Sequence, residues 1–290
     1  MFEWNIYILC FITLTTGFLI HFTRGIYSKT KPDNMLNLWS FNLYQNVFAL
    51  ATVLIIFISS NMLGSFSWYS VKLGVLMGIA NVMSLYASLK AYAVGPFSYT
   101  TVVVSLSVIM PALSGLFYGE SISPVQYAGV LMMILCIILS PENNADNNKS
   151  SVKWLIWSVI ASMVSGLVGI FQKVHQGSLQ HSSEMSALLI SCFTTSVIIC
   201  FICYLHEITK LKKKIICREK ISFVHILCGF SNAVSHSINI FLVGILPAII
   251  IFPVVNLVPM IFLILSSVLI FKEKLSIRRW IGVASGIIST

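Results

Sequence analysis

Charged residues are scarce in this sequence. Only 9% of the 290 residues are Asp, Glu, Lys or Arg, whereas a soluble domain carries about 25%. At the same time 57% of the residues are hydrophobic, which is more apolar surface than a globular chain of this length can hide in one core. This imbalance excludes an ordinary soluble domain and indicates that lipid covers part of the protein.

Acidic residues are the scarcest charged class, and none of the nine lies inside a long apolar run. They lie at the ends of such runs or between them, at Glu3, Asp33, Glu120, Glu142, Asp146, Glu184, Glu207, Glu219 and Glu273. The sequence also has no H-E-x-x-H motif, no pair of aspartates within an apolar run and no Ser/His/acid set. We therefore expect no enzyme activity, no catalytic residue, no metal site and no cofactor.

Positive charge is less scarce, because 18 Lys and Arg residues give a formal net charge of +9. These residues lie mainly in short segments between apolar runs. That placement is typical of topology signals and of contact with anionic lipid. It argues against nucleic acid as a partner and favours the lipid bilayer.

Long apolar runs occupy most of the chain, and a helix that spans a bilayer needs roughly 20 mostly apolar residues. Ten such runs can be drawn between segments with turn residues. They cover residues 4–23, 38–60, 69–92, 96–118, 122–140, 152–173, 184–206, 221–244, 247–271 and 277–290. The sequence thus predicts an all-α integral membrane protein with ten transmembrane helices.

A repeated pattern divides the chain into two halves. A Gly-x-x-Asn-x-x-Ser motif followed by a proline recurs 151 positions later. The matching pairs are Gly78 and Gly229, Asn81 and Asn232, Ser84 and Ser235, and Pro96 and Pro247. Near the starts of the halves, Gly17, Phe22 and Arg24 match Gly166, Phe171 and Lys173. The sequence therefore predicts two copies of one structural unit.

Each copy holds five predicted spans, and an odd number of crossings inserts the second copy from the opposite side of the membrane. The prediction is two inverted five-helix repeats, an architecture common in secondary transporters, whose binding sites lie between the repeats near the membrane midplane. We place the first repeat at residues 1–140, a polar, Asn-rich linker at 141–151 and the second repeat at 152–290.

The ends of the two copies resemble a known family. Residues 91–96 read Ala-Tyr-Ala-Val-Gly-Pro, residues 118–123 read Tyr-Gly-Glu-Ser-Ile-Ser, and residues 271–276 read Phe-Lys-Glu-Lys-Leu-Ser. These segments, with Pro111 after the first of them, resemble the EamA-like family of the drug/metabolite transporter superfamily. The resemblance implies ten helices in two inverted halves around a central cavity. Members carry amino acids, drugs, nucleotide sugars and other metabolites.

The repeats and the resemblance together lead to one functional expectation. We expect a multi-pass transporter of a small polar metabolite or drug-like solute, located in a cell membrane such as a bacterial plasma membrane. Its two halves would rock, by alternating access, about a central cavity formed by spans 1, 3, 4, 6, 8 and 9. The alternative is a membrane sensor or interaction protein that keeps the fold without transporting.

Polar side chains inside the spans are the candidates for contact with this solute, because each needs a partner in hydrocarbon. Asn81 and Asn232 occupy equivalent places in the two repeats. His236 and Asn239 follow Asn232 by four and seven residues, so the three share one face of a helix. The alternative role for each is a hydrogen bond between neighbouring helices.

Four further candidates are Tyr86 in the third span and Gln172, Lys173 and His175 at the end of the sixth. Tyr86 would otherwise serve in packing. Lys173 would contact an anionic group of the solute, or else extend to the membrane interface and pair with Glu184.

Charge also bears on the solute and its coupling. Lys90 and Lys173 favour a solute with an anionic or zwitterionic group. Because no carboxylate lies within a predicted span, coupling to protons would depend on histidine, whose ordinary pKa of about 6.5 suits that role. The candidates are His21, His175 and His236. The alternative is facilitated diffusion or exchange without proton coupling.

Orientation and oligomeric state stay open. Sixteen of the eighteen Lys and Arg residues flank odd-numbered loops, which the positive-inside rule places in the cytosol, with both termini outside. The family resemblance instead implies cytosolic termini. Gly282-x-x-x-Gly286 in the last span permits close helix packing, either within one chain or in a homodimer.

Overall fold

The computed structural model describes residues 2–31, 34–61, 63–114, 148–178, 180–210 and 221–270, together with a few isolated positions. Within these ranges the chain folds into helices, and no strand is present. The longer helices are α1 (Phe2–Thr30), α2 (Met35–Ser59), α3 (Trp68–Val94), α7 (Asn148–Gln176), α8 (Met185–Lys210), α9 (Phe223–Ile245) and α10 (Ala248–Leu269). After α3 come α4 (Phe97–Ser105), the 3₁₀ turn η1 (Leu106–Val108) and α5 (Ile109–Ser114).

Eight of the ten predicted spans fall on these helices. In the described part of the chain, six helices are long and apolar enough to cross a membrane, namely α1, α2, α3, α7, α8 and α9. The spans predicted at 96–118 and 247–271 correspond to the run from α4 to α5 and to α10. Those predicted at 122–140 and 277–290, the latter with Gly282-x-x-x-Gly286, lie outside the described residues. The all-α membrane fold is confirmed, and the count of ten helices stays a prediction.

Several helices continue beyond the apolar runs that predicted them. α1 reaches Thr30, seven residues past the predicted end at 23, and α7 begins at Asn148, four residues before the predicted start of the second repeat. A helix satisfies its own backbone groups wherever it meets the membrane interface, while long polar side chains extend to water. As a consequence, Arg24 lies well inside α1 and not at its end.

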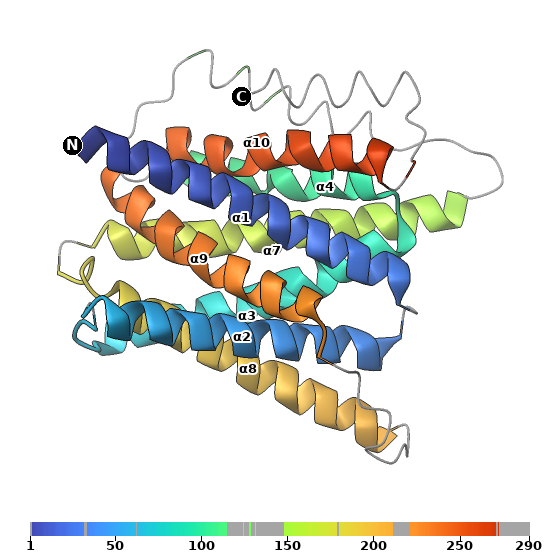
Figure 1. Ribbon diagram of the computed structural model, residues 1–290, viewed down its shortest axis with the longest axis horizontal. Helices are drawn as coiled ribbons and strands as arrows, with labels where there is room; N and C mark the ends of the chain where they lie inside the picture. The colour runs from blue at the N-terminus through green and yellow to red at the C-terminus, as the bar shows by residue number, and fades with distance from the viewer. Residues whose placement is uncertain are drawn as a thin grey trace.

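The third helix of each half packs mainly on the other half (Figure 1). α3 lies against α7 and α8, whereas α9 lies against α1 and α2; the contacts of α3 and α9 with the helices of their own halves are slighter. We call α1, α2, α9 and α10 the α1 group, and α3, α4, α5, α7 and α8 the α7 group. The two groups meet where α2 packs on α8 and where α10 packs on α4 and α5.

These contacts are symmetric when the halves are exchanged. The packing of α3 on α8 has its counterpart in that of α9 on α2, and α1 on α10 corresponds to α7 on α4 and α5. In Figure 1, α1 runs from left to right and α7 from right to left, so equivalent helices are antiparallel. An odd number of crossings must then precede α7. The described helices supply four, and a fifth span at 122–140, outside the described residues, would agree with this parity.

Two repeat-related glycines permit the tightest of these crossings. A Cβ atom on Gly78 would lie 2.5 Å from the carbonyl oxygen of Cys192 on α8, and one on Gly229 would lie 2.5 Å from that of Gln45 on α2. Any side chain at these positions would push the helices apart, which glycine avoids. The two glycines thus perform the same packing role in the two halves.

Glycine also meets proline at the crossings of α1 with α10 and of α7 with α5. A Cβ on Gly17 would lie 3.2 Å from Cγ of Pro259, and one on Gly169 would lie 2.9 Å from Cγ of Pro111. The turn η1 contains Ser107, the residue four before Pro111, because proline cannot donate a hydrogen bond to the carbonyl four residues earlier. α10, by contrast, is assigned as helix through both Pro253 and Pro259.

Candidate functional site

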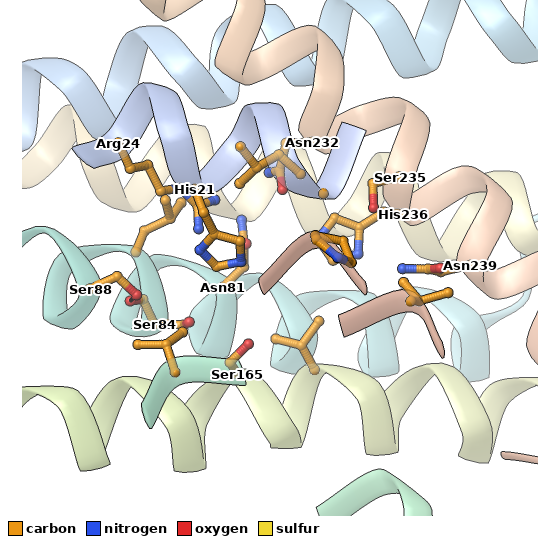
Figure 2. A pocket seen from close by; sticks show the side chains of 17 residues that line it. His21, Arg24, Asn81, Ser84, Ser88, Ser165, Asn232, Ser235, His236 and Asn239 are labelled. Carbon is orange, nitrogen blue, oxygen red and sulfur yellow. Dashed lines mark hydrogen bonds between the residues drawn. The ribbon is translucent and has the colours of Figure 1, made fainter. Parts of the chain in front are cut away.

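A cavity of about 110 Å³ lies between the two helix groups. Its wall comes from α1, α3, α4, α7, α9 and α10, the same six spans that the sequence places around a central site. The polar side chains on the wall are His21, Arg24, Asn81, Ser84, Ser88, Ser165, Asn232, Ser235, His236 and Asn239 (Figure 2). None of the lining residues in the described part of the chain is Asp or Glu. The wall is therefore partly polar and partly apolar, and it carries the positive charge of Arg24.

Two pairs of repeat-related residues face this cavity from opposite sides. Asn81 and Ser84 lie on α3, in the α7 group, and Asn232 and Ser235 lie on α9, in the α1 group. The Gly-x-x-Asn-x-x-Ser motif thus places its glycine at a helix crossing and its asparagine and serine at the cavity. This division of roles explains why the three residue types recur together in both halves.

The two asparagines differ in their hydrogen bonds. Nδ2 of Asn81 donates to Oδ1 of Asn46, 3.1 Å away, and to Oγ of Ser196, 3.2 Å away. Nδ2 of Asn232 is buried and has no hydrogen-bond partner among the described residues. Asn81 therefore connects α3 to α2 and α8, while Nδ2 of Asn232 connects α9 to no other described helix.

The remaining polar stripe on α9 continues along the same wall. Nε2 of buried Gln172 lies 2.9 Å from Nδ1 of His236. The amide nitrogen can only donate, so Nδ1 accepts and the ring of His236 carries its proton on Nε2. Farther along, Oδ1 of Asn239 is buried without a partner in the described residues. The structure therefore places His236 and Asn239 on the cavity and Gln172 behind His236, and their contact with a solute stays a prediction.

α1 supplies two polar lining residues that were not among the predicted solute contacts, although His21 was a candidate for proton coupling. Arg24 is only 7% exposed, and its Nε has no partner among the described residues. Nδ1 of His21 lies 3.1 Å from Oη of Tyr92. The apolar run that predicts this span stops at residue 23, so Arg24 reads as a flanking charge. Its repeat match with Lys173, another cation in a span, was the signal that would have drawn attention to it.

Besides Gln172, three predicted site residues do not line this cavity. Tyr86 points away from it and stacks on Trp39 of α2, with ring centroids 5.1 Å apart. His175 lies near one end of the bundle, where its Nε2 is 3.0 Å from Oγ of Ser70. Lys173 is buried on α7 and is absent from the lining. The position of a residue along a span predicts its depth in the membrane. Which face of the helix lines the cavity depends instead on how segments far apart in the sequence pack together.

At the end of the bundle where His175 lies, the carboxylate of Glu184 makes hydrogen bonds that link the first half of the chain to the second. Glu184, just before α8, accepts hydrogen bonds from Ser65, Ser67 and Ser70, and its Oε1 lies 3.3 Å from Nδ1 of His181. These bonds, those from Ser67 and Ser70 foremost, lower the pKa of Glu184 to about 2. The charged form is therefore the one that connects α8 to the start of α3.

Stability is expected to depend on pH through this carboxylate. Because the pKa of Glu184 falls from its ordinary 4.5 to about 2 on folding, its contribution is complete above pH 4.5 and is lost as pH falls toward 2. Thermal unfolding of the wild type and of Glu184→Gln in detergent should give a difference in Tm that is constant between neutral pH and about pH 5. That difference should shrink below pH 4.5. A difference that widens on acidification would contradict this.

Comparison with known proteins agrees with this architecture. Residues 152–290 match the EamA-like transporter family. No curated protein matches the chain. A solved structure, described only as the crystal structure of a protein, superposes with a TM-score of 0.65 at 11% identity, over 98% of this chain and 94% of its own. At that identity the likeness shows the fold alone, and it includes both halves. The match of residues 152–290 to the EamA-like transporter family confirms the resemblance seen in the sequence.

Proposed function

We propose that this chain transports a small polar solute across a cell membrane by alternating access, through the cavity between the two helix groups. The observation that carries the proposal is the cavity wall, to which both halves contribute the same Asn and Ser positions of a repeated motif. A polar hollow inside an apolar bundle has no packing benefit of its own, because buried polar groups without partners are costly. The match of the second half to a transporter family supports transport as its purpose.

The packing favours a particular movement. Sequence reasoning expected the two halves to rock against each other, but the third helix of each half packs on the opposite half. We take the α1 group and the α7 group as the units that move relative to one another, with the contacts of α2 on α8 and of α10 on α4 and α5 as the places where they meet. Since the cavity lies between the two groups, a rocking motion would open one end while closing the other.

Loss of His236 is expected to abolish transport without unfolding the protein. A thermal-shift screen of amino acids, sugars, nucleotides and quaternary amines identifies a solute, because a binder raises Tm by mass action. Uptake of that solute into proteoliposomes should fall by at least about tenfold in His236→Ala, as expected for a lost contact in a desolvated site. His206→Ala is the matched control, since the side chain of His206 is 71% exposed at the end of α8 and should leave uptake unchanged.

The same experiment separates transport from the alternative. A solute that binds in a His236-dependent way but is not taken up would favour a sensor that retains the fold. Uptake that His236→Ala leaves unchanged would move the site away from this cavity. Folded protein that neither binds nor carries any of the four compound classes would contradict the proposal.

A further inference from the structure

We propose that Arg24 binds the carboxylate of the transported solute, so that the protein selects small monocarboxylates. This inference rests on the proposed function and adds the chemical class of the solute. It starts from an arginine that is more than nine-tenths buried, in the middle of a membrane protein, on the wall of an internal cavity.

The position of Arg24 does not suit extension to the membrane interface. α1 continues for six residues beyond it, to Thr30, which is about 9 Å of helix at 1.5 Å per residue. Figure 2 shows the side chain lying along the cavity beside His21 and near Asn81, which belongs to α3. An arginine that only anchored a helix end would instead extend outward to water.

The described surroundings of Arg24 leave its charge uncompensated. None of the lining residues in the described ranges is acidic, and Nε has no hydrogen-bond partner there. The guanidinium does interact with the thiol of Cys228, but a thiol is a weak acceptor and carries no charge to balance it. A buried cation without a counter-ion is strongly unfavourable. The cavity is where a counter-ion would enter, and a solute that brings one would be bound for that reason.

A carboxylate fits this site better than a phosphate. The planar guanidinium donates two parallel hydrogen bonds to a carboxylate, and one positive charge balances one negative charge. A phosphate monoester carries nearly two negative charges at neutral pH. Arg24 is the one Lys or Arg among the described lining residues, so the second charge would stay unbalanced in a low dielectric.

The rest of the cavity limits the size and polarity of the solute. A volume of about 110 Å³ holds roughly seven to eleven waters, so the solute has at most about that many non-hydrogen atoms. Away from Arg24, Nδ2 of Asn232 and Oδ1 of Asn239 are buried without partners in the described residues. They offer one donor and one acceptor to a hydroxyl or amino group at the other end of the solute.

The sequence pointed to an anionic or zwitterionic solute on other grounds. That expectation rested on Lys90 and Lys173, neither of which lines the cavity described above. Arg24 occupies the repeat position of Lys173 in the first half. Arg24, which does face the cavity, therefore supports the same preference for an anionic or zwitterionic solute.

The test compares acids with their amides on the purified protein in nanodiscs of uncharged phosphatidylcholine. The probes are propionate with propionamide, lactate with lactamide, and 4-aminobutyrate with 4-aminobutanamide, together with inorganic phosphate. At least one acid is expected to raise Tm at millimolar concentration, with its amide and phosphate ineffective. Arg24→Gln should weaken its binding by at least about tenfold. Lys72→Gln, which removes an exposed cation beside Trp68, should not.

Several outcomes would overturn the assignment. They are equal stabilisation by an acid and its amide, stronger binding of phosphate than of any carboxylate, stabilisation by none of the acids, or affinity unchanged in Arg24→Gln. If Arg24→Gln does not fold, Arg24→Lys keeps the charge but loses the two-pronged geometry, and it should still weaken binding several-fold. Unchanged affinity in Arg24→Lys would then overturn the proposal.

Flux measurements keep this proposal apart from the general one. Arg24-dependent binding of a carboxylate with no flux into liposomes would support the carboxylate site and contradict transport. Uptake of a neutral or cationic solute at the same rate in wild type and Arg24→Gln would support transport and contradict the proposal that the solute is a carboxylate.

Discussion

Gly78→Ala and Gly229→Ala should each destabilise the protein strongly and by similar amounts. The new Cβ would lie 2.5 Å from a backbone carbonyl oxygen in both cases, on α8 for the first and on α2 for the second. Backbone atoms cannot rotate aside as a side-chain end can, so two long helices must separate. Overpacking of this kind costs about 1–3 kcal/mol, and we expect the upper part of that range. Thermal unfolding in detergent and the yield of monodisperse protein are the measurements.

Gly244→Ala is the matched control for this pair. A Cβ on Gly244 would lie 2.6 Å from Oε1 of Gln176, which is the far end of a flexible side chain. Gln176 can move aside, and alanine is the better residue within a helix, so stability should change by less than about 1 kcal/mol. Equal losses in all three variants would show that the cost reflects replacement of glycine in general and not the helix crossings.

Asn81→Ala and Asn232→Ala should have opposite consequences although the two residues are repeat equivalents. Asn81→Ala removes the Nδ2 donor of two hydrogen bonds, to Asn46 and to Ser196, that join α3 to two other helices. We expect a loss of about 1–3 kcal/mol of stability. Asn232→Ala removes an amide nitrogen that has no partner in the described residues. It should change stability by less than about 0.5 kcal/mol, because no existing bond is lost, while weakening solute binding at least fivefold.

Two measurements on each variant distinguish these roles. Thermal unfolding without solute reports the structural part, and the solute-induced shift in Tm reports the binding part. If Asn232→Ala proved as destabilising as Asn81→Ala with binding intact, both residues would serve helix association. Our assignment of Asn232 to the solute would then fail.

Much of the fold could be predicted from the sequence, because the length and composition of apolar runs are set by bilayer thickness. The 151-residue repeat indicated two related halves, and Gly78 and Gly229 turn out to pack in equivalent ways. The exchange of third helices could not be predicted. An apolar helix face carries no mark of whether its neighbour comes from its own half or the other, so α3 could have packed on α2 as readily as on α8.

Residues on the cavity wall could be predicted where helical spacing defines a face, or where the repeat relates one residue to another, as it relates Asn81 to Asn232. Asn232, His236 and Asn239 share one side of α9, and all three line the cavity. Arg24 was left out because the apolar run ends one residue before it, although the helix does not. The different bonding of Asn81 could not be foreseen either, since its partners belong to α2 and α8, far away in the chain.

The exchange of third helices has a consequence for how such a protein can assemble. α3 finds its main contacts on α7 and α8, and α9 finds its own on α1 and α2. A single repeat inserted by itself would leave its third helix without the groove it occupies here. Residues 1–147 and 148–290, produced as separate polypeptides, would need each other to fold and would enter the bilayer in opposite senses.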